Sequence, residues 1–224
     1  MKKLLIIFVL ILLPLISINS PINNIEFKAY IVNYSTETYA NSIRNRAKFV
    51  LSDVNIRYLK LDDVPTEHIM VMEQYRRLFN LPVDKYYRLI YKESRFNDTI
   101  KSKVGAHGYM QVMPTTFDWI KSTLDNLTPD SEYYLYGLTI NDPNDPIDNI
   151  KAGTFLLYWL KTNVYKRYPN ETESYKWKRI LASYNAGYGV HNKAMYTYSE
   201  TVDYVDFISK RSPIKIKPII KYIY

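Results

Sequence analysis

The spacing of apolar residues along the chain predicts a succession of α-helices. Between residues 35 and 53, apolar side chains recur every three or four positions, which is the period of one helix face. The same period returns after Pro65, Pro82, Pro114 and Pro146, and proline suits the first turn of a helix. Two further helices are expected, one ending at Gly187 and one over residues 199–211.

The segments between these helices read as loops. Residues 97–108 read as a loop, and residues 125–146 are rich in Asp, Asn and Pro, which favour turns. Residues 21–34 read as irregular or as a short strand. Residues 214–218 alternate apolar and basic side chains, which fits either an edge strand or a solvated arm. The pattern therefore predicts a mainly α domain.

The N-terminus has the layout of an export signal. Lys2 and Lys3 precede the uncharged apolar run Leu4–Ile18, and a basic start followed by such a run is typical of a secretory signal peptide. The run is short for a transmembrane helix and contains Pro14. Because Pro21 is a poor context for cleavage near Ser20, an uncleaved membrane tether through residues 4–18 remains an alternative. We expect export to the periplasm or cell envelope.

The amino-acid composition excludes several kinds of active site and metal site. The chain has 224 residues, no cysteine and only three histidines, so a thiolate metal site, a cysteine nucleophile and a disulfide scaffold are excluded. No glycine-rich nucleotide-binding motif occurs. We expect no metal and no cofactor. The net charge of +8 fits either an anionic partner or a basic background, and no nucleic-acid-binding motif accompanies it.

Glu93 is the strongest candidate for acid–base chemistry. It falls on the same helix face as Tyr86, Leu89 and Ile90. A carboxyl group partly removed from water favours its neutral form, so its pKa should rise toward the range of a general acid. The alternative is a helix-end glutamate that reaches solvent or pairs with Arg88 or Arg95.

Five sequence blocks surround this glutamate in a fixed order. They are YKESRFN over 91–97, KSKVGAHGYMQVMPTT over 101–116, DPIDNIKAG over 145–153, ASYNAGYGV over 182–190 and ETVDYV over 200–205. Together they resemble the catalytic domain of the soluble-type lytic transglycosylases, which have a goose-lysozyme-like α fold. The resemblance covers roughly residues 75–208.

The resemblance implies a substrate and a set of site residues. The substrate would be peptidoglycan glycan strands, cut between N-acetylmuramic acid and N-acetylglucosamine to leave a 1,6-anhydromuramoyl end. Glu93 stands where the family places its single acid and base. The matching positions implied to line the groove are Ser102, Gln111 and Met113 near the glutamate, Tyr184 and Asn185 on the opposite wall, and the carboxylate Glu200.

One carboxylate suffices for this reaction. A glycoside hydrolase usually needs two carboxylates to activate water or form a covalent intermediate. In a lytic transglycosylase the C6 hydroxyl of the sugar replaces water, so Glu93 first protonates the leaving oxygen and then accepts the C6 proton. The nucleophile is tethered, and its positioning supplies much of the rate. Gln111 and Tyr184 are expected to position substrate, with the Tyr184 hydroxyl free to bond the substrate or Glu93.

The chain departs from the family pattern at three positions. His107 replaces a small residue, Tyr109 replaces Leu, and Val202 replaces Arg, which removes a charge partner of Glu200. We expect His107 to be an exposed loop residue. Among the 23 tyrosines, Tyr109 and Tyr188 lie in motif loops and are predicted to contact the saccharide.

Two other functions remain open. A goose-type muramidase would hydrolyse the same bond and would need a second carboxylate, with Asp98 or Glu200 as candidates. A non-catalytic peptidoglycan-binding protein would keep the groove alone. The sequence also predicts a domain order and a monomer: 1–20 signal peptide or anchor, 21–74 helical extension, 75–208 catalytic domain, and 209–224 basic C-terminal tail, which is expected to improve retention on anionic sacculi.

Overall fold

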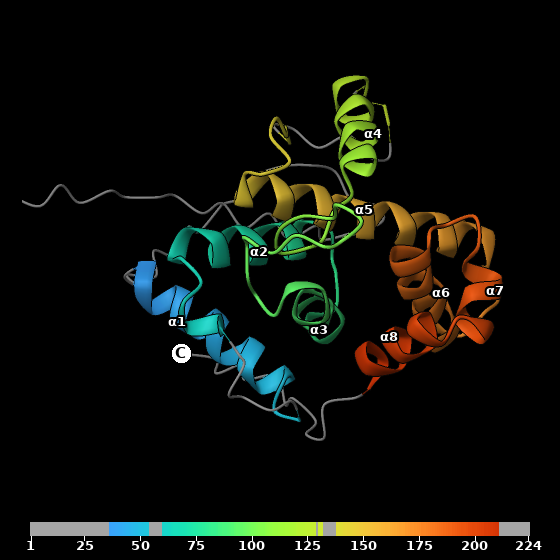
Figure 1. The fold of residues 1–224 in the computed structure, drawn as a ribbon, viewed down its shortest axis with the longest axis horizontal. Coiled ribbons are helices and arrows are strands. Elements are labelled where there is room, and N and C mark those ends of the chain that lie inside the picture. Colours follow the sequence, from blue (N-terminus) through green and yellow to red (C-terminus); the bar gives the residue numbers. More distant parts are fainter. Residues whose placement is uncertain (1–35, 54–59, 129, 132–137, 211–224) are drawn as a thin grey trace, which may run out of the picture. The chain divides into compact units, whose positions relative to one another are not determined.

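The described part of the chain is helical. The computed structural model describes residues 36–53, 60–128, 130–131 and 138–210, and within them no strand forms beyond two isolated bridges. The prediction of a mainly α fold is confirmed (Figure 1). The elements are α1 (Thr36–Val50), the 3-10 turn η2 (Lys60–Asp62), α2 (Thr66–Leu78), α3 (Val83–Ser94), α4 (Pro114–Asp125), α5 (Pro146–Arg167), α6 (Glu173–Ala186), α7 (His191–Thr197) and α8 (Ser199–Ser209).

The predicted helix starts are confirmed, and proline marks most of them. Pro65 and Pro82 immediately precede α2 and α3, and Pro114 is the first residue of α4. At α5 the side chain of Asp145 accepts a hydrogen bond from the Asp148 backbone N–H at 2.8 Å. This bond satisfies one of the N–H groups that a helix start leaves without a partner.

Two short elements were not predicted. α7 has only seven residues, and η2 has three. A helix of one or two turns is unstable alone and depends on tertiary packing. For α7 the packing partners are α6 and α8, with Ala194 and Met195 buried. The predictions for residues 1–20, 21–34 and 214–218 lie outside the described residues.

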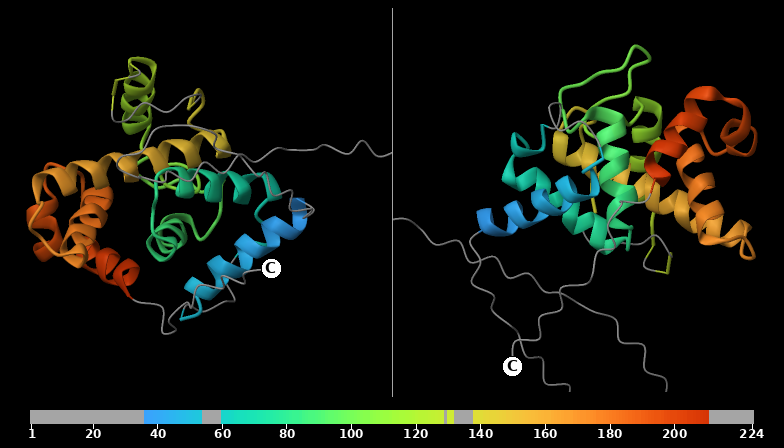
Figure 2. Two further views of the ribbon diagram at one scale, coloured as in Figure 1. Left: turned by 180° about the vertical axis from the view of Figure 1, so that it is seen from behind. Right: turned by 90° about the horizontal axis from the view of Figure 1, so that it is seen from below.

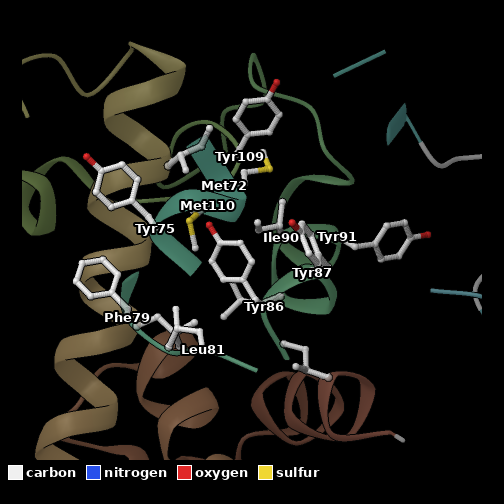
Figure 3. Packing of buried hydrophobic residues seen from close by; sticks show 14 of the residues in the cluster. Met72, Tyr75, Phe79, Leu81, Tyr86, Tyr87, Ile90, Tyr91, Tyr109 and Met110 are labelled. Carbon is white, nitrogen blue, oxygen red and sulfur yellow. The ribbon is translucent and has the colours of Figure 1, made fainter. Parts of the chain in front are cut away.

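α3 lies between the other helices and carries the centre of the core. α1 and α8 pack against it, while α5 packs against α2 and α6 (Figures 1 and 2). Tyr86 and Tyr87 are fully buried, with ring centroids 5.4 Å apart in an edge-to-face arrangement. Figure 3 shows these rings gathered with Met110 from the loop before α4. The core therefore joins α3 to the loop that carries the second motif block.

A buried carboxylate fastens α2 to its neighbours. Glu73 is 1% exposed and pairs with Arg46 of α1 at 2.8 Å and with Arg76 and Arg77 of its own helix at 2.7 Å each. The Tyr87 hydroxyl donates to it at 3.0 Å. Burial alone would raise the pKa of Glu73, but the arginines lower it to about 2. The carboxylate therefore stays charged and joins α1, α2 and α3.

A second ion pair holds α3 to α1 and α8. Arg88 is fully buried and bonds Asp53 at 2.5 Å, and its guanidinium carbon lies 5.4 Å from the centre of the Phe207 ring.

None of the helices in the described ranges is long and apolar enough to cross a membrane.

Candidate active site

Glu93 lies in the last turn of α3, where the helix ends abruptly. Arg95 and Phe96 both have positive φ, at 55° and 62°, which turns the chain out of the helix into the loop over 97–113. The Glu93 side chain is half-buried on the apolar face, next to the fully buried Leu89 and Ile90. Its Oε1 accepts a hydrogen bond from the Tyr204 hydroxyl of α8 at 2.5 Å.

The environment of Glu93 raises its pKa to about 7, mainly because burial disfavours the charged carboxylate. The hydrogen bond from Tyr204 and the charge of Lys92 act in the opposite direction, and the negative charge of Glu200 adds to the rise. Near neutral pH the protonated and ionised forms are therefore both populated, which suits a group that first gives and then takes a proton. Arg88, one of the alternative partners of Glu93, pairs with Asp53 instead.

Tyr204 is the residue that sequence reasoning missed. It is 2% exposed, and burial, followed by the charge of Glu93, raises its pKa well above the usual value. The hydroxyl thus stays protonated and keeps donating to the carboxyl. Its signal was present in the ETVDYV block, where Tyr204 is the one side chain in the second half of the motif that can donate a hydrogen bond.

Tyr184 does not take the role predicted for it as a partner of Glu93. Its hydroxyl is not free: it donates to the backbone carbonyl of Met110 at 2.9 Å. The charge of Glu93 contributes to the raised pKa of Tyr184 after burial, which places the two side chains near each other. Tyr184 therefore ties α6 to the motif loop beside Glu93. Its role toward substrate stays a prediction.

Asn185 joins α6, the helix of Tyr184, to α8. Its side-chain oxygen accepts a hydrogen bond from the Thr201 hydroxyl at 2.7 Å. Thr201 follows Glu200, which is exposed in the first turn of α8. Asn185, Glu200 and Tyr204 thus come from α6 and α8, which pack against each other and are joined by this part-buried hydrogen bond.

Ser102 and Gln111 shape the loop over 97–113. The Ser102 hydroxyl accepts a hydrogen bond from the Ala106 backbone N–H at 2.9 Å. Gln111 has a φ of 47°, and its amide nitrogen donates to the carbonyl oxygens of Ile100 and Gly108 at 3.1 and 3.0 Å. Met113 follows as the half-buried cap of α4. The predicted substrate contacts of these three side chains stay predictions.

Asn149 of α5 clamps this loop. It donates to the His107 carbonyl at 2.9 Å and accepts from the Met110 backbone N–H at 3.0 Å. A Cβ atom on Gly108 would lie 2.7 Å from the Asn149 side chain, and one on Gly153 would lie 2.4 Å from the Cβ of Met110. Only glycine fits at both positions, so the third motif block holds the second block in place.

Two predictions about the loop are wrong. Tyr109 is 1% exposed, and its hydroxyl is hydrogen-bonded to His68 Nδ1 at 3.0 Å, so it packs in the core and does not contact a saccharide. His107 is half-buried and not exposed. Its Nδ1 lies 3.0 Å from the Asn144 side-chain oxygen, and it lines a cavity of about 230 Å³ together with Asp98 and Lys101. Glu93 does not line this cavity.

The described residues offer no cluster of three or more His, Asp and Glu side chains that could hold a metal ion.

One protein-family model matches a large part of this chain. The family model described as "Transglycosylase SLT domain" matches residues 70–206, more than half of the chain. The comparison with curated protein sequences found no significant match.

Two solved structures are among those that resemble the chain. The 70-kDa soluble lytic transglycosylase of Escherichia coli is 22% identical, with a TM-score of 0.48 over 79% of this chain and 29% of that one. The lytic transglycosylase Slt of Pseudomonas aeruginosa, solved as an inactive mutant, is 19% identical, with a TM-score of 0.47 over 77% of this chain and 26% of that one. The present chain therefore spans less than a third of either solved protein.

Proposed function

The chain belongs to the transglycosylase SLT domain family, and we propose that it is a peptidoglycan lytic transglycosylase with Glu93 as its single general acid and base. The bond cleaved is the β-1,4 bond between N-acetylmuramic acid and N-acetylglucosamine. The product is a 1,6-anhydromuramoyl end. The observation that carries the proposal is Glu93 itself: a half-buried carboxyl with a pKa of about 7, held by a hydrogen bond from Tyr204.

In the first step the protonated Glu93 donates its proton to the glycosidic oxygen as the C1–O bond of the muramoyl residue breaks. The N-acetylglucosamine unit leaves with a free 4-hydroxyl group. Positive charge develops at the muramoyl C1, and Glu93 becomes a carboxylate next to it. Tyr204 then matters most, because its hydrogen bond stabilises the carboxylate form.

In the second step the C6 hydroxyl of the same muramoyl residue attacks C1. The Glu93 carboxylate accepts the C6 proton, the C6–O–C1 bond closes the anhydro ring, and the enzyme returns to its starting protonation state. No water is consumed. A pKa close to neutral serves both steps, because it balances donation in the first against acceptance in the second.

Hydrolysis is the second candidate, because Glu200 lies close enough for its charge to act on Glu93. A muramidase would use such a second carboxylate to activate water. Glu200 is exposed, however, and an exposed carboxylate lacks the fixed position that orienting a water molecule requires. Asp98, the other candidate for the second carboxylate, lines the same cavity as His107. Glu93 does not line this cavity.

We further propose that the chain acts in the periplasm or cell envelope, exported through residues 1–20 or tethered by residues 4–18. Five basic residues lie within 210–221, namely Lys210, Arg211, Lys215, Lys217 and Lys221. Clustered positive charge attracts anionic sacculi at low salt, and the attraction between solvent-exposed charges is screened over about 8 Å at physiological salt. Residues 1–20 and 211–224 lie outside the described residues.

The test is product analysis. Purified sacculi are digested with the protein, and the released muropeptides are examined by mass spectrometry before and after borohydride reduction. Anhydro ends resist reduction and are lighter than hydrolysed ends by one water. Predominantly anhydro products support the proposal. Predominantly reducible products would establish a muramidase, and the absence of any soluble product would favour a binding protein.

A further inference from the structure

Four residues of the second motif block form a tight turn. The Gln111 backbone N–H donates to the Gly108 carbonyl at 3.3 Å, which closes a β-turn with Tyr109 and Met110 at its centre. Gln111 leaves this turn with a φ of 47°, a left-handed conformation that is uncommon outside glycine. Such a backbone persists where the surrounding structure holds it in place. We call residues 108–111 the motif turn.

Three helices hold the motif turn. The Met110 N–H donates to Asn149 of α5 at 3.0 Å, and the Met110 carbonyl accepts from Tyr184 of α6 at 2.9 Å. The third contact comes from α2, where His68 Nδ1 is hydrogen-bonded to the Tyr109 hydroxyl at 3.0 Å. The two rings meet edge to face, with centroids 5.6 Å apart at an interplanar angle of 78°. Both central residues of the turn are therefore fixed from outside it.

The Tyr109 hydroxyl needs this partner because it is buried. Tyr109 is 1% exposed, and burial, followed by the charge of Asp98, raises its pKa, so the hydroxyl stays protonated. A buried hydroxyl group without a hydrogen bond destabilises the fold. Tyr109 also replaces the leucine of the family pattern, and leucine has no group that could bond His68. The bond is thus a feature of this particular chain.

The motif turn connects His68 with the candidate active site. The charge of Glu93 contributes to the raised pKa of Tyr184, whose hydroxyl bonds the turn at Met110. The turn ends at Gln111, which is predicted to position substrate, and the Gln111 amide in turn donates to two loop carbonyls. α2 itself contributes no residue to the five motif blocks. His68 therefore joins a helix outside those blocks to the region of the substrate.

We propose that His68 is a positioning residue for the cleavage reaction, which acts through Tyr109 to keep the motif turn, and with it Gln111, in the conformation that receives the glycan strand. This inference rests on the proposed function. His68 is not among the groups that shift the pKa of Glu93. Its loss therefore lowers the rate of cleavage without changing the pH at which Glu93 titrates.

Four variants of the full chain test the pair by the release of anhydro products per folded molecule. His68→Leu and Tyr109→Phe each remove one partner, and each should lower kcat/KM about tenfold. The double variant should be no slower than either single variant, because each change already breaks the same bond. His68→Asn should keep most of the rate, since its side-chain amide can bond the Tyr109 hydroxyl. The alkaline limb of the pH profile should stay in place in all four variants.

Hydrogen exchange of the free protein gives a readout that needs no catalysis. The backbone N–H groups of Gln111 and Val112 are both hydrogen-bonded within the loop. In the two single variants these amides should exchange about tenfold faster, whereas the amides of α6 should keep their rates. The matched control is Tyr165→Phe, which removes a hydroxyl that bonds Glu173 and no atom of the motif turn. It should change neither the exchange of the turn nor kcat/KM.

Three results would overturn the proposal. If His68→Leu and Tyr109→Phe lower only the melting temperature and turn over like wild type, the pair serves stability alone. If the losses in the double variant multiply, the two side chains act separately. If the alkaline limb moves, the effect belongs to the proton affinity of Glu93.

Failure of the proposed function has a different signature. In that case the wild-type chain itself releases no anhydro products, while the exchange rates still report whether His68 holds the motif turn. If anhydro products form and neither the rate nor the exchange responds to His68→Leu, only the role of His68 is refuted.

Discussion

The hydrogen bond between Tyr204 and Glu93 gives the sharpest prediction about mechanism. Tyr204→Phe removes one hydroxyl group and keeps the ring, which is 2% exposed in the core. In the wild type this hydroxyl donates to Glu93 Oε1 at 2.5 Å and lowers the pKa of the carboxyl against the effect of burial. Without it the carboxylate loses its bonded donor, so the pKa of Glu93 should rise further.

The size of the shift follows from the strength of such bonds. A hydrogen bond to a charged group contributes about 1.5–3 kcal/mol, and one pKa unit corresponds to about 1.4 kcal/mol. The pKa of Glu93 should therefore move from about 7 to about 8–9. At pH 7 the general acid would be almost fully protonated, but it would be a weaker acid and its carboxylate would no longer be oriented. We expect the maximal rate to fall about tenfold.

The assay is the pH dependence of kcat/KM for release of anhydro products, because its alkaline limb reports the acid of the free enzyme. In Tyr204→Phe this limb should move upward by about one to two pH units. Tyr86→Phe is the control: it removes a buried hydroxyl that bonds Thr154 at 2.8 Å and not Glu93, so its limb should stay in place. A limb in Tyr204→Phe that stays in place or moves downward would refute the reasoning.

The remaining predictions concern stability and the loop. Because Glu93 has a pKa of about 7 when folded and 4.5 ordinarily, its ionisation weakens the fold as pH rises from 4.5 to 7. The stability of Glu93→Gln relative to wild type, measured by urea unfolding, should thus increase over this range by at most about 3 kcal/mol, and a constant difference would contradict the buried carboxyl. Glu73, with a pKa of about 2, stabilises the fold above pH 4.5 and loses this effect as pH falls toward 2. Glu73→Gln should therefore cost about 3–5 kcal/mol at pH 7 and much less at pH 2; an equal cost at both would show that the charge is unimportant. Asn149→Ala leaves the Met110 N–H without its partner and removes one of the two hydrogen bonds to the His107 carbonyl, so it should cost about 2 kcal/mol and slow turnover, whereas unchanged turnover would show that the loop does not depend on this clamp.

Much of the helical fold was predictable because local signals and packing agree. Pro82 and the apolar face with Tyr86, Leu89 and Ile90 gave α3 its start and its buried side. Where local signals are weak, the prediction failed. α7 has little apolar pattern of its own and is stabilised by α6 and α8. At the end of α2 the apolar Leu78 is 53% exposed, while the neighbouring Phe79 is buried, and apolar spacing alone does not distinguish the two.

The position of Glu93 in the fold was predictable, but its hydrogen-bond partner was not. The placement of Glu93 on a buried helix face followed from spacing alone, and the raised pKa followed from burial. Which tyrosine bonds Glu93 depends on how α6 and α8 pack, and no spacing within one helix encodes that. The charge of Glu93 contributes to the raised pKa of both Tyr184 and Tyr204. Of these two hydroxyl groups, the one that donates a hydrogen bond to Glu93 is that of Tyr204. Tyr109 illustrates the same limit, since a motif loop can bury its aromatic residue in the core.

The central claim is that one carboxyl group performs both proton transfers. The most direct measurement compares the rate of anhydro-product release, per folded molecule, for Glu93→Gln, Glu200→Gln and Asp98→Asn. Glu93→Gln should lower the rate at least about a thousandfold, while Glu200→Gln and Asp98→Asn should stay within about tenfold of wild type. Near wild-type turnover by Glu93→Gln, or a loss in either other variant as large as its own, would contradict a single-carboxylate mechanism.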